Sequence, residues 1–412
     1  MPHLILYHVF IGKKTVFKEL GISRILSISV YCYHIIMKLL PKFIWGFCIV
    51  LFCSVFLVWL ANTSKPTGHE NTYPEAKPVV VQPLPEAKKP ATPPASGKQP
   101  QFVVMAFDGS RSLPMWQKTL DFSQQLKSQG KTAHFTYFLS GVYFLNYRKS
   151  FRYTPPHGKP GDSLIGFADS NLDVKERVDY VNRAIAEGHE IGSHANGHYT
   201  GAAWSAADWQ KEFSSFQNLV FSIAQNNDVS PQDAADYTVN LTPSQLIGFR
   251  APDLGRNSAL YTTLKNNGFA YDTSSVSKSD AWPIKMKNGL WEFPLAQIKY
   301  ASTTSNILSM DYNFYFKQSK AKNVTTKGTP EWQSFYNDTY NSYMNYFNSN
   351  YTGNRAPVFI GSHFSEWNDG VYWEAMKNMA EDVCGKPEVQ CVTFTELMNY
   401  LEKADASKPT TR

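Results

Sequence analysis

Short apolar runs alternate with longer helix-like segments from residue 101 onward, and this alternation limits the possible folds more than any other feature of the chain. Such a repeat places parallel strands side by side under helices, so the sequence predicts an α/β fold with a distorted (β/α) barrel. The predicted helices are residues 116–130, 174–188, 206–226, 258–268, 332–348, 371–384 and 394–404. Residues 146–171 and 305–329 are predicted as loop insertions.

Four of the apolar runs end in a charged or polar side chain. The carboxyl end of a buried strand is where such a fold presents catalytic groups, so these side chains are predicted to lie together. A plainer interpretation exists for each, as a turn cap, a surface arginine or a core histidine. The side chains are Asp108, Arg250, Asp272 and His363, after runs that begin at Phe102, Ile247, Phe269 and Val358.

His194 and His198 are four residues apart, behind an apolar residue that can end a buried strand. Imidazole nitrogens at this spacing can bind one divalent ion from a helix turn or from a tight loop, and Gly197 favours the loop. The chain has 10 histidines in 412 residues, so the spacing alone also fits two solvated loop histidines.

In their order along the chain, these residues resemble the five motifs of the polysaccharide deacetylase family, the NodB-homology esterases of carbohydrate esterase family 4. The resemblance extends from residue 101 to about residue 400, and it implies the distorted barrel of the NodB-homology type. The spacing near Trp204 and Trp209 resembles the chitin-deacetylase-like branch. The matched positions are Asp108, His194, His198, Arg250, Pro252, Asp272 and His363.

The resemblance implies metal-dependent hydrolysis of the N-acetyl amide of a chitin-, peptidoglycan- or exopolysaccharide-type polymer. It implies that His194 and His198 bind a divalent metal, zinc in the first place, which activates a water molecule. His363 then protonates the leaving amine, and Asp272 hydrogen-bonds His363. Arg250 holds the base carboxylate in an ion pair.

Other residues are candidates for the groove that would hold the polysaccharide. The backbone amide after Pro252 is expected to face the oxyanion. Indole rings can stack on sugars, although they are more often core residues. The groove candidates are Pro252, Asp253, Trp282 and Trp367, with Trp291 as a further indole.

The first motif departs from the family, because the family usually has two adjacent carboxylates where this chain has only Asp108. In one match Asp108 is the base and Gly109 stands where the third metal ligand belongs. In the other, Asp108 is the ligand and Phe107 has replaced the base. We prefer the first match, because Phe107 then continues the strand pattern.

A metal held by two imidazoles should bind less tightly than one held by three ligands. The candidates for a replacement ligand are Asp253, Ser110 and Ser193, and Asp253 itself stands where the family usually has an aromatic residue. The missing carboxylate leaves an alternative function open, in which the protein is a degenerate family member that binds polysaccharide without hydrolysing it.

Residues 1–100 predict a membrane tether. Phe43–Ala61 has 19 residues without a charge, which is roughly the length of a helix that spans the ~30 Å hydrocarbon layer. Basic residues precede it, so residues 1–42 are predicted in the cytoplasm and the catalytic domain in the periplasm or outside the cell. A cleaved signal peptide competes with this reading, but no A-x-A site follows. Met37 is an alternative start of the chain.

Residues 62–100 hold nine of the 24 prolines and almost no large apolar residues, so a disordered linker is predicted before the domain at residues 101–412. The net charge of +6 is mild and gathers in the N-terminal part, which argues against a nucleic-acid partner. Aromatic residues make up 15% of the chain and charged residues 18%, a balance that suits an uncharged carbohydrate.

Cys384 and Cys391 are the only cysteines after residue 53. They flank Gly385-Lys386-Pro387, which can turn the chain and bring the two sulfurs together. A disulfide is therefore predicted, and it would fit an oxidising compartment.

Overall fold

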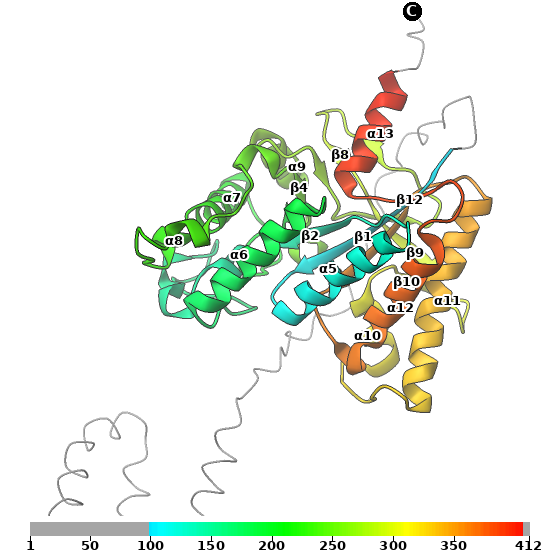
Figure 1. Cartoon of the computed structure of the whole chain (residues 1–412). Coiled ribbons are helices and arrows are strands. Elements are labelled where there is room, and N and C mark those ends of the chain that lie inside the picture. The colour runs from blue at the N-terminus through cyan, green and yellow to red at the C-terminus, as the bar shows by residue number, and fades with distance from the viewer. Residues whose placement is uncertain (1–98, 407–412) are drawn as a thin grey trace, which may run out of the picture. The chain divides into compact units, whose positions relative to one another are not determined.

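The computed structural model describes residues 99–406 (Figure 1). The predictions for the cytoplasmic segment, the Phe43–Ala61 anchor and the Pro-rich linker lie outside the described residues. Between residues 99 and 406, no helix is both long enough and apolar enough to cross a bilayer.

One mostly parallel sheet of nine strands organises the described residues. Its order is β11-β1-β2-β3-β4-β5-β8-β7, and β12 also pairs with β1. All pairs are parallel except β7 with β8. The strands are β1 (Gln101–Gly109), β2 (Phe135–Leu139), β3 (Glu190–Ser193), β4 (Gly248–Phe249), β5 (Tyr271–Asp272), β7 (Ile284–Lys285), β8 (Trp291–Glu292), β11 (Val358–His363) and β12 (Val389–Cys391).

The apolar runs predicted as strands are therefore confirmed as β1, β4, β5 and β11. Phe102 to Phe107 are all buried, as expected for a parallel strand that is covered on both faces. Each of these strands ends within one residue of the polar residue named from the sequence.

A second sheet of three strands lies between β5 and β11 along the chain. It comprises β6 (Val276–Lys278), β9 (Leu295–Lys299) and β10 (Asn306–Leu308) in the order β10-β9-β6. A parallel bridge from Met310 to Gly361 of β11 connects this sheet to the edge of the large one. The α/β prediction is confirmed. The large sheet runs from β11 at one end to β7 at the other without closing into a complete barrel, and the small mixed sheet adjoins its β11 edge.

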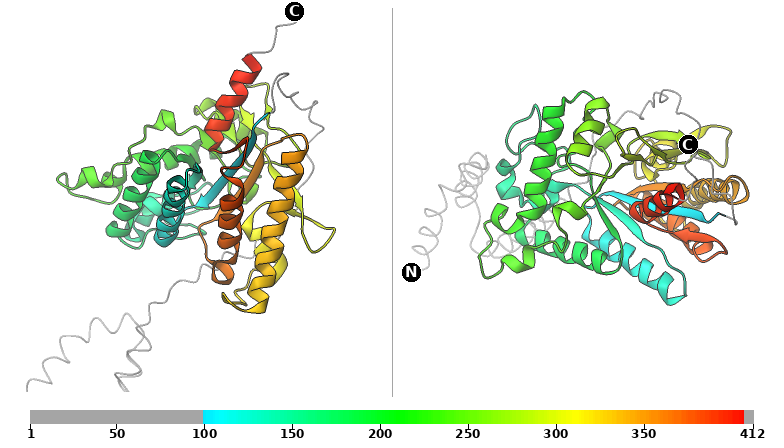
Figure 2. Two further views of the ribbon diagram at one scale, coloured as in Figure 1. Left: turned by 45° about the vertical axis from the view of Figure 1, so that its right-hand side comes forward. Right: turned by 90° about the horizontal axis from the view of Figure 1, so that it is seen from above.

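Helices cover the large sheet, and all seven predicted helices are present. In Figures 1 and 2, α5 and α6 lie along one part of the sheet, and α11 and α12 run side by side at another. The long helices are α5 (Leu113–Ser128), α6 (Asn171–Ala186), α7 (Ala206–Phe221), α9 (Ser258–Asn266), α11 (Pro330–Thr352), α12 (Trp367–Val383) and α13 (Phe394–Ala406).

Short elements fill the connections between the long helices and the strands. The prediction of a loop at residues 305–329 was wrong in part, because this segment contains β10 and α10. Residues 146–171 contain the 3-10 helix η2 and are otherwise mostly irregular. The short helices are α8 (Ile223–Asn226), α10 (Asp311–Ser319), η1 (Gly141–Phe144), η2 (Tyr147–Arg152), η3 (Ala234–Tyr237), η4 (Pro243–Gln245) and η5 (Pro252–Leu254).

The two faces of β1 pack against different parts of the core. Val103, Met105 and Phe107 belong to the large cluster between sheet and helices. Phe102, Val104 and Ala106 belong to an inner cluster that also contains residues of β2, β11 and α13. Successive side chains of a strand alternate between its faces, so Asp108 continues the row of Ala106 on the inner side.

The predicted disulfide between Cys384 and Cys391 is confirmed, with a Cα–Cα distance of 5.8 Å. It joins the end of α12 to β12, and both residues are buried.

Replacing both cysteines by alanine is expected to lower the free energy of unfolding by about 2–3 kcal/mol, because a short closed loop no longer restricts the unfolded chain. Urea unfolding of the full-length protein measures this change. The wild type in excess reductant is the control and should match the double variant. Equal stability of the oxidised and reduced wild type would contradict the prediction.

Candidate active site

Asp108 and Arg250 form a buried ion pair where β1 and β4 end. Nη1 of Arg250 lies 2.8 Å from Oδ1 of Asp108, and the two side chains are 0% and 2% exposed. The guanidinium also lies over the Phe138 ring, 4.7 Å from its centre. Burial alone would raise the pKa of Asp108, but Arg250, His194 and His363 outweigh it, and the pKa lies below its usual range. Asp108 is thus an ionised carboxylate, and Arg250 is not a surface arginine.

His194 and His198 lie in a tight loop directly after β3. Their ring centres are 5.2 Å apart. The loop is not helical, since Ala195 and His198 have φ values of 54° and 62°. The sequence was therefore correct in favouring a loop over a helix turn.

The two imidazoles are in the form that binds metal ions. Nδ1 of His194 donates to the carbonyl oxygen of Arg250 at 2.8 Å, which leaves Nε2 as the nitrogen with a lone pair. Burial lowers the pKa of His194 to about 3, and it also lowers the pKa of His198. Both rings are therefore neutral near pH 7, as coordination requires.

His363 ends β11 beside Asp108, with which it is in register across the strands. Its Nδ1 donates to Oδ1 of Asp311 at 2.7 Å, and its backbone amide donates to Oδ2 at 2.8 Å. Burial alone would lower the pKa of His363, but the Asp311 and Asp108 carboxylates outweigh it and raise the pKa. An imidazole with a raised pKa is suited to act as an acid.

The partner of His363 is thus Asp311, which corrects the prediction of Asp272. Asp272 accepts from the amide of Ser274 at 2.9 Å and from its hydroxyl at 2.7 Å. Ser274 Oγ in turn accepts from the amide of Ala251 at 2.8 Å. Burial raises the pKa of Asp272 to about 6. Asp272 therefore caps its own turn, and through Ser274 it holds the backbone next to Arg250.

Asp253 lies beside the imidazole pair. Its Oδ1 is 3.9 Å from Nδ1 of His198, and its side chain is 37% exposed. It has a φ of 51° inside η5, directly after the buried Pro252. Asp253 therefore borders the imidazole pair, and the assignment of Pro252 and Asp253 to a polysaccharide groove stays a prediction.

The tryptophans separate into two groups. Trp367 lies against His363, with ring centres 5.3 Å apart, and one of its faces is covered by Tyr315 at 4.7 Å. Trp282 belongs to the inner core cluster and is 6% exposed, so the prediction that it lines a groove was wrong. Trp291 is also buried, and its Nε1 donates to Glu402 of α13 at 2.6 Å. Core packing explains these two indoles.

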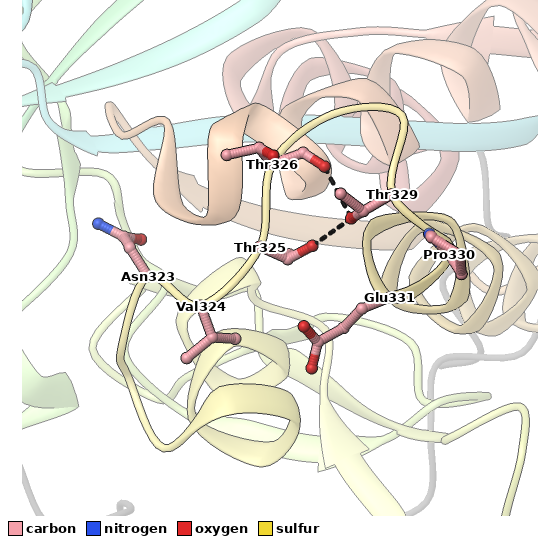
Figure 3. A pocket seen from close by; sticks show the side chains of 7 residues that line it. All are labelled: Asn323, Val324, Thr325, Thr326, Thr329, Pro330 and Glu331. Atoms are coloured by element: carbon pink, nitrogen blue, oxygen red, sulfur yellow. Dashed lines mark hydrogen bonds between the residues drawn. The ribbon is translucent and has the colours of Figure 1, made fainter.

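A hollow of about 590 Å³ lies between the loop that follows α10 and the start of α11. Figure 3 shows its lining, the loop from Asn323 to Thr329 and the start of α11 at Pro330 and Glu331. Asn323 Oδ1 accepts from the Tyr315 hydroxyl at 3.2 Å and from the Asn368 amide at 2.8 Å. The hollow therefore adjoins the aromatic residues next to His363.

The structure thus brings Asp108, His194, His198, Arg250 and His363 together at the carboxyl ends of the strands. Two neutral imidazoles form a donor set that suits zinc. Within residues 99–406, however, no group of three or more His, Cys, Asp or Glu side chains is arranged to hold a metal ion. Among the described His, Cys, Asp and Glu side chains, none, Asp253 included, completes a three-ligand group with His194 and His198.

Asp311 is the functional residue that sequence reasoning missed. It follows β10 in the run Asn306-Ile307-Leu308-Ser309-Met310, so it repeats the pattern of an apolar strand followed by an acid. That pattern was a usable signal. It was overlooked because the surrounding residues were interpreted as a loop.

No protein-family model and no curated protein matches the sequence. Solved structures similar in fold include a protein described as a polysaccharide deacetylase from Mycobacterium smegmatis, with a TM-score of 0.48, 12% identity, and coverage of 79% of this chain and 98% of that chain. The peptidoglycan deacetylase PdaC from Bacillus subtilis has a TM-score of 0.37 and 13% identity over 74% of this chain and 94% of that chain.

A CE4 family pseudoenzyme from Bacillus anthracis is also similar, with a TM-score of 0.38 and 10% identity over 75% of this chain and 69% of that chain. These three structures are described as a polysaccharide deacetylase, a peptidoglycan deacetylase and a CE4 family pseudoenzyme. None of the three is described as a chitin deacetylase, so that branch stays a prediction.

Proposed function

We propose that the protein is a metal-dependent deacetylase that hydrolyses the N-acetyl amide of an N-acetylated polysaccharide of the chitin, peptidoglycan or exopolysaccharide type. One observation carries the proposal. An ionised carboxylate, a pair of neutral imidazoles and an imidazole with a raised pKa lie together where the strands end. Amide hydrolysis needs a base, a means of activating water and an acid, and these groups can provide all three.

His194 and His198 would hold a divalent cation, zinc in the first place, and its weak binding would follow from the lack of a third protein ligand. A bound divalent cation lowers the pKa of a water molecule and polarises the acetyl carbonyl. The Arg250 carbonyl fixes the tautomer of His194 and keeps Nε2 directed away from the backbone.

Asp108 would take the proton from water. Phe107 supports this assignment, because its ring packs on Phe135, Tyr137 and Phe364 in the helix-side core. A group at position 107 would face this core, so it could not have been the base. Arg250 keeps Asp108 ionised and fixes its position. Gly109 then occupies the place of the missing ligand.

His363 would donate a proton to the amine as it leaves. Its Nδ1 is bonded to Asp311, so Nε2 is the nitrogen that can donate to the substrate. Trp367 and Tyr312 pack near the ring and shield this side of the site from water.

Asp311→Asn is expected to lower kcat by about 10²-fold or more, because His363 loses the carboxylate that stabilises its protonated form. Asp311 raises the pKa of His363, so its removal lowers that pKa. The acid must be protonated to act. The loss of kcat at high pH should therefore begin at a lower pH in the variant than in the wild type.

A pH profile of kcat for acetate release measures this shift. Asp338→Asn is a matched control, since Asp338, on α11, accepts from the hydroxyls of Tyr300 and Ser302 and forms no hydrogen bond with His363. An unchanged alkaline limb in Asp311→Asn would contradict the role given to His363.

A second candidate function is polysaccharide binding without hydrolysis. The lack of a three-residue metal site within residues 99–406 favours it. Metal analysis of the full-length protein, together with acetate release from chitin oligomers, peptidoglycan and poly-N-acetylglucosamine, separates the two. Bound metal with acetate release supports the deacetylase. Polysaccharide binding with neither metal nor acetate would replace it with the binding protein.

We also propose that the domain works outside the cytoplasm, tethered by the Phe43–Ala61 helix. The disulfide between Cys384 and Cys391 supports this placement, because such bonds persist in oxidising compartments.

A further inference from the structure

The loop that carries His194 and His198 has an unfavourable backbone. Ala195 and His198 both have positive φ values, of 54° and 62°, and neither is a glycine. Non-glycine residues adopt this region at an energetic cost, and they stay there only when surrounding contacts hold them. Some part of the structure must therefore fix the loop between the two imidazoles.

Glu212 of α7 provides that contact from behind the loop. Its Oε1 accepts from the amide of Asn196 at 3.0 Å, and its backbone carbonyl accepts from the side-chain amide of Asn196 at 2.9 Å. Glu212 and Asn196 are both fully buried. The residue two positions after His194 is thus fixed by a helix that contributes nothing else to the site.

Tyr153 extends the same contact to the next residue of the loop. Its hydroxyl donates to Glu212, 3.1 Å from each carboxylate oxygen, and accepts from the amide of Gly197 at 3.2 Å. Tyr153 is 1% exposed. Between them, the two side chains bind the backbone amides of Asn196 and Gly197, two of the three residues between the histidines.

The position of Glu212 is itself rigid and unusual. Its neighbours on α7, Trp209 and Phe213, are buried in the core between helix and sheet. No Lys, Arg or His forms an ion pair with Glu212 within the described part of the chain. A buried carboxyl group without a cation is costly, and here hydrogen bonds to the loop offset that cost.

We propose that Glu212 and Tyr153 are positioning residues that set the spacing of His194 and His198 for metal binding without touching the ion. The inference rests on the proposed function, since it takes this loop to be the metal-binding loop. It adds that metal affinity depends on a carboxyl group that does not bind the ion but holds the loop through Asn196.

The experiment compares Glu212→Gln and Tyr153→Phe with the wild type, all as full-length protein. Tyr153→Phe removes one hydroxyl and keeps the ring, so it should fold. Zinc affinity is measured by competition with a chelator, and the absorption spectrum of the cobalt-substituted protein reports the ligand geometry. Both variants are expected to bind zinc about tenfold more weakly or worse, with an altered cobalt spectrum, as for other residues that orient metal ligands.

Glu190→Gln is the matched control. Glu190 is a partly buried carboxyl group that also accepts from a tyrosine hydroxyl, Tyr271 at 2.9 Å, and it lies at the start of the strand that leads to His194. Its contacts go to Thr136 and Thr395 and not to the loop. It should lose folding stability to a similar degree while keeping wild-type zinc affinity and the wild-type cobalt spectrum.

Two results would overturn the inference while the proposed function stands. In one, Glu212→Gln and Tyr153→Phe bind zinc as tightly as the wild type. In the other, Glu190→Gln weakens zinc binding as much as Glu212→Gln does, which would mean that the effect comes from general destabilisation. A wild type that binds neither zinc nor cobalt would overturn the inference together with the metal-dependent function.

Discussion

Asp108→Asn is expected to abolish acetate release, by roughly 10²–10⁴-fold, while the protein keeps its metal. The amide has the shape of the carboxylate but cannot take a proton from water. Metal should remain because Phe107 faces the helix-side core and Asp108 is engaged by Arg250, which makes Asp108 the base rather than a ligand. Acetate release and metal content are measured on the same preparation.

The same substitution tests the ion pair. The Asn oxygen can still accept from Arg250, but the buried guanidinium loses its counter-charge, so some stability should also be lost. Asp382→Asn is the control, because Asp382, at the surface of α12, accepts from the Tyr340 hydroxyl of α11, far along the chain from Asp108 and Arg250. Loss of metal from Asp108→Asn, with the fold intact, would make Asp108 the ligand and refute the preferred match.

Gly109→Asp is expected to raise zinc affinity on the order of 100-fold, because it returns a carboxylate to the place where the family's third ligand stands. Space is available, since a Cβ at this position would lie 3.9 Å from both Ser140 Oγ and Tyr143 Cε2, in ordinary contact. The backbone conformation, in contrast, is unfavourable for any residue other than glycine. Gly109 has a φ of 80°, so any other residue there should cost about 1 kcal/mol in stability.

Gly109→Asn is the matched control, since asparagine loses the same folding stability at this positive φ but does not add a charged ligand. Zinc titration of both variants against the wild type isolates the effect of the carboxylate. Equal affinities for the Asp and Asn variants would contradict the assignment of Gly109 to the ligand position. Equal affinities would also argue against the view that one carboxylate is all that the two imidazoles need to complete a metal site.

Much of the site could be predicted because its residues are adjacent to strong local signals. Asp108, Arg250 and His363 each follow an apolar run, and parallel strands bring such positions to one edge of a sheet. The His194–His198 spacing is likewise local, and Gly197 indicated a loop. For these residues, local sequence signals were enough to predict where the side chains lie.

The errors concern contacts between distant parts of the chain. Asp311 reaches His363 across 52 residues, and α10, which places it, is short and mostly polar, so its sequence resembles a loop. Trp282 was misjudged because its burial depends on α13, which folds into the inner core cluster from the end of the chain. The small sheet was missed because its strands are only three to five residues long.

Asp108 and His363 face each other across two hydrogen-bonded strands, whereas Asp311 belongs to a helix outside the large sheet. In the proposed mechanism, Asp108 accepts a proton and His363 donates one. The distance between these two residues is set by the pairing of β1 with β11, and neither side chain can change it alone. The pKa of His363 is set by Asp311, and therefore by the distance between α10 and His363. Under the proposed mechanism, a shift of α10 would therefore change the pH at which His363 acts as an acid without changing the distance between Asp108 and His363.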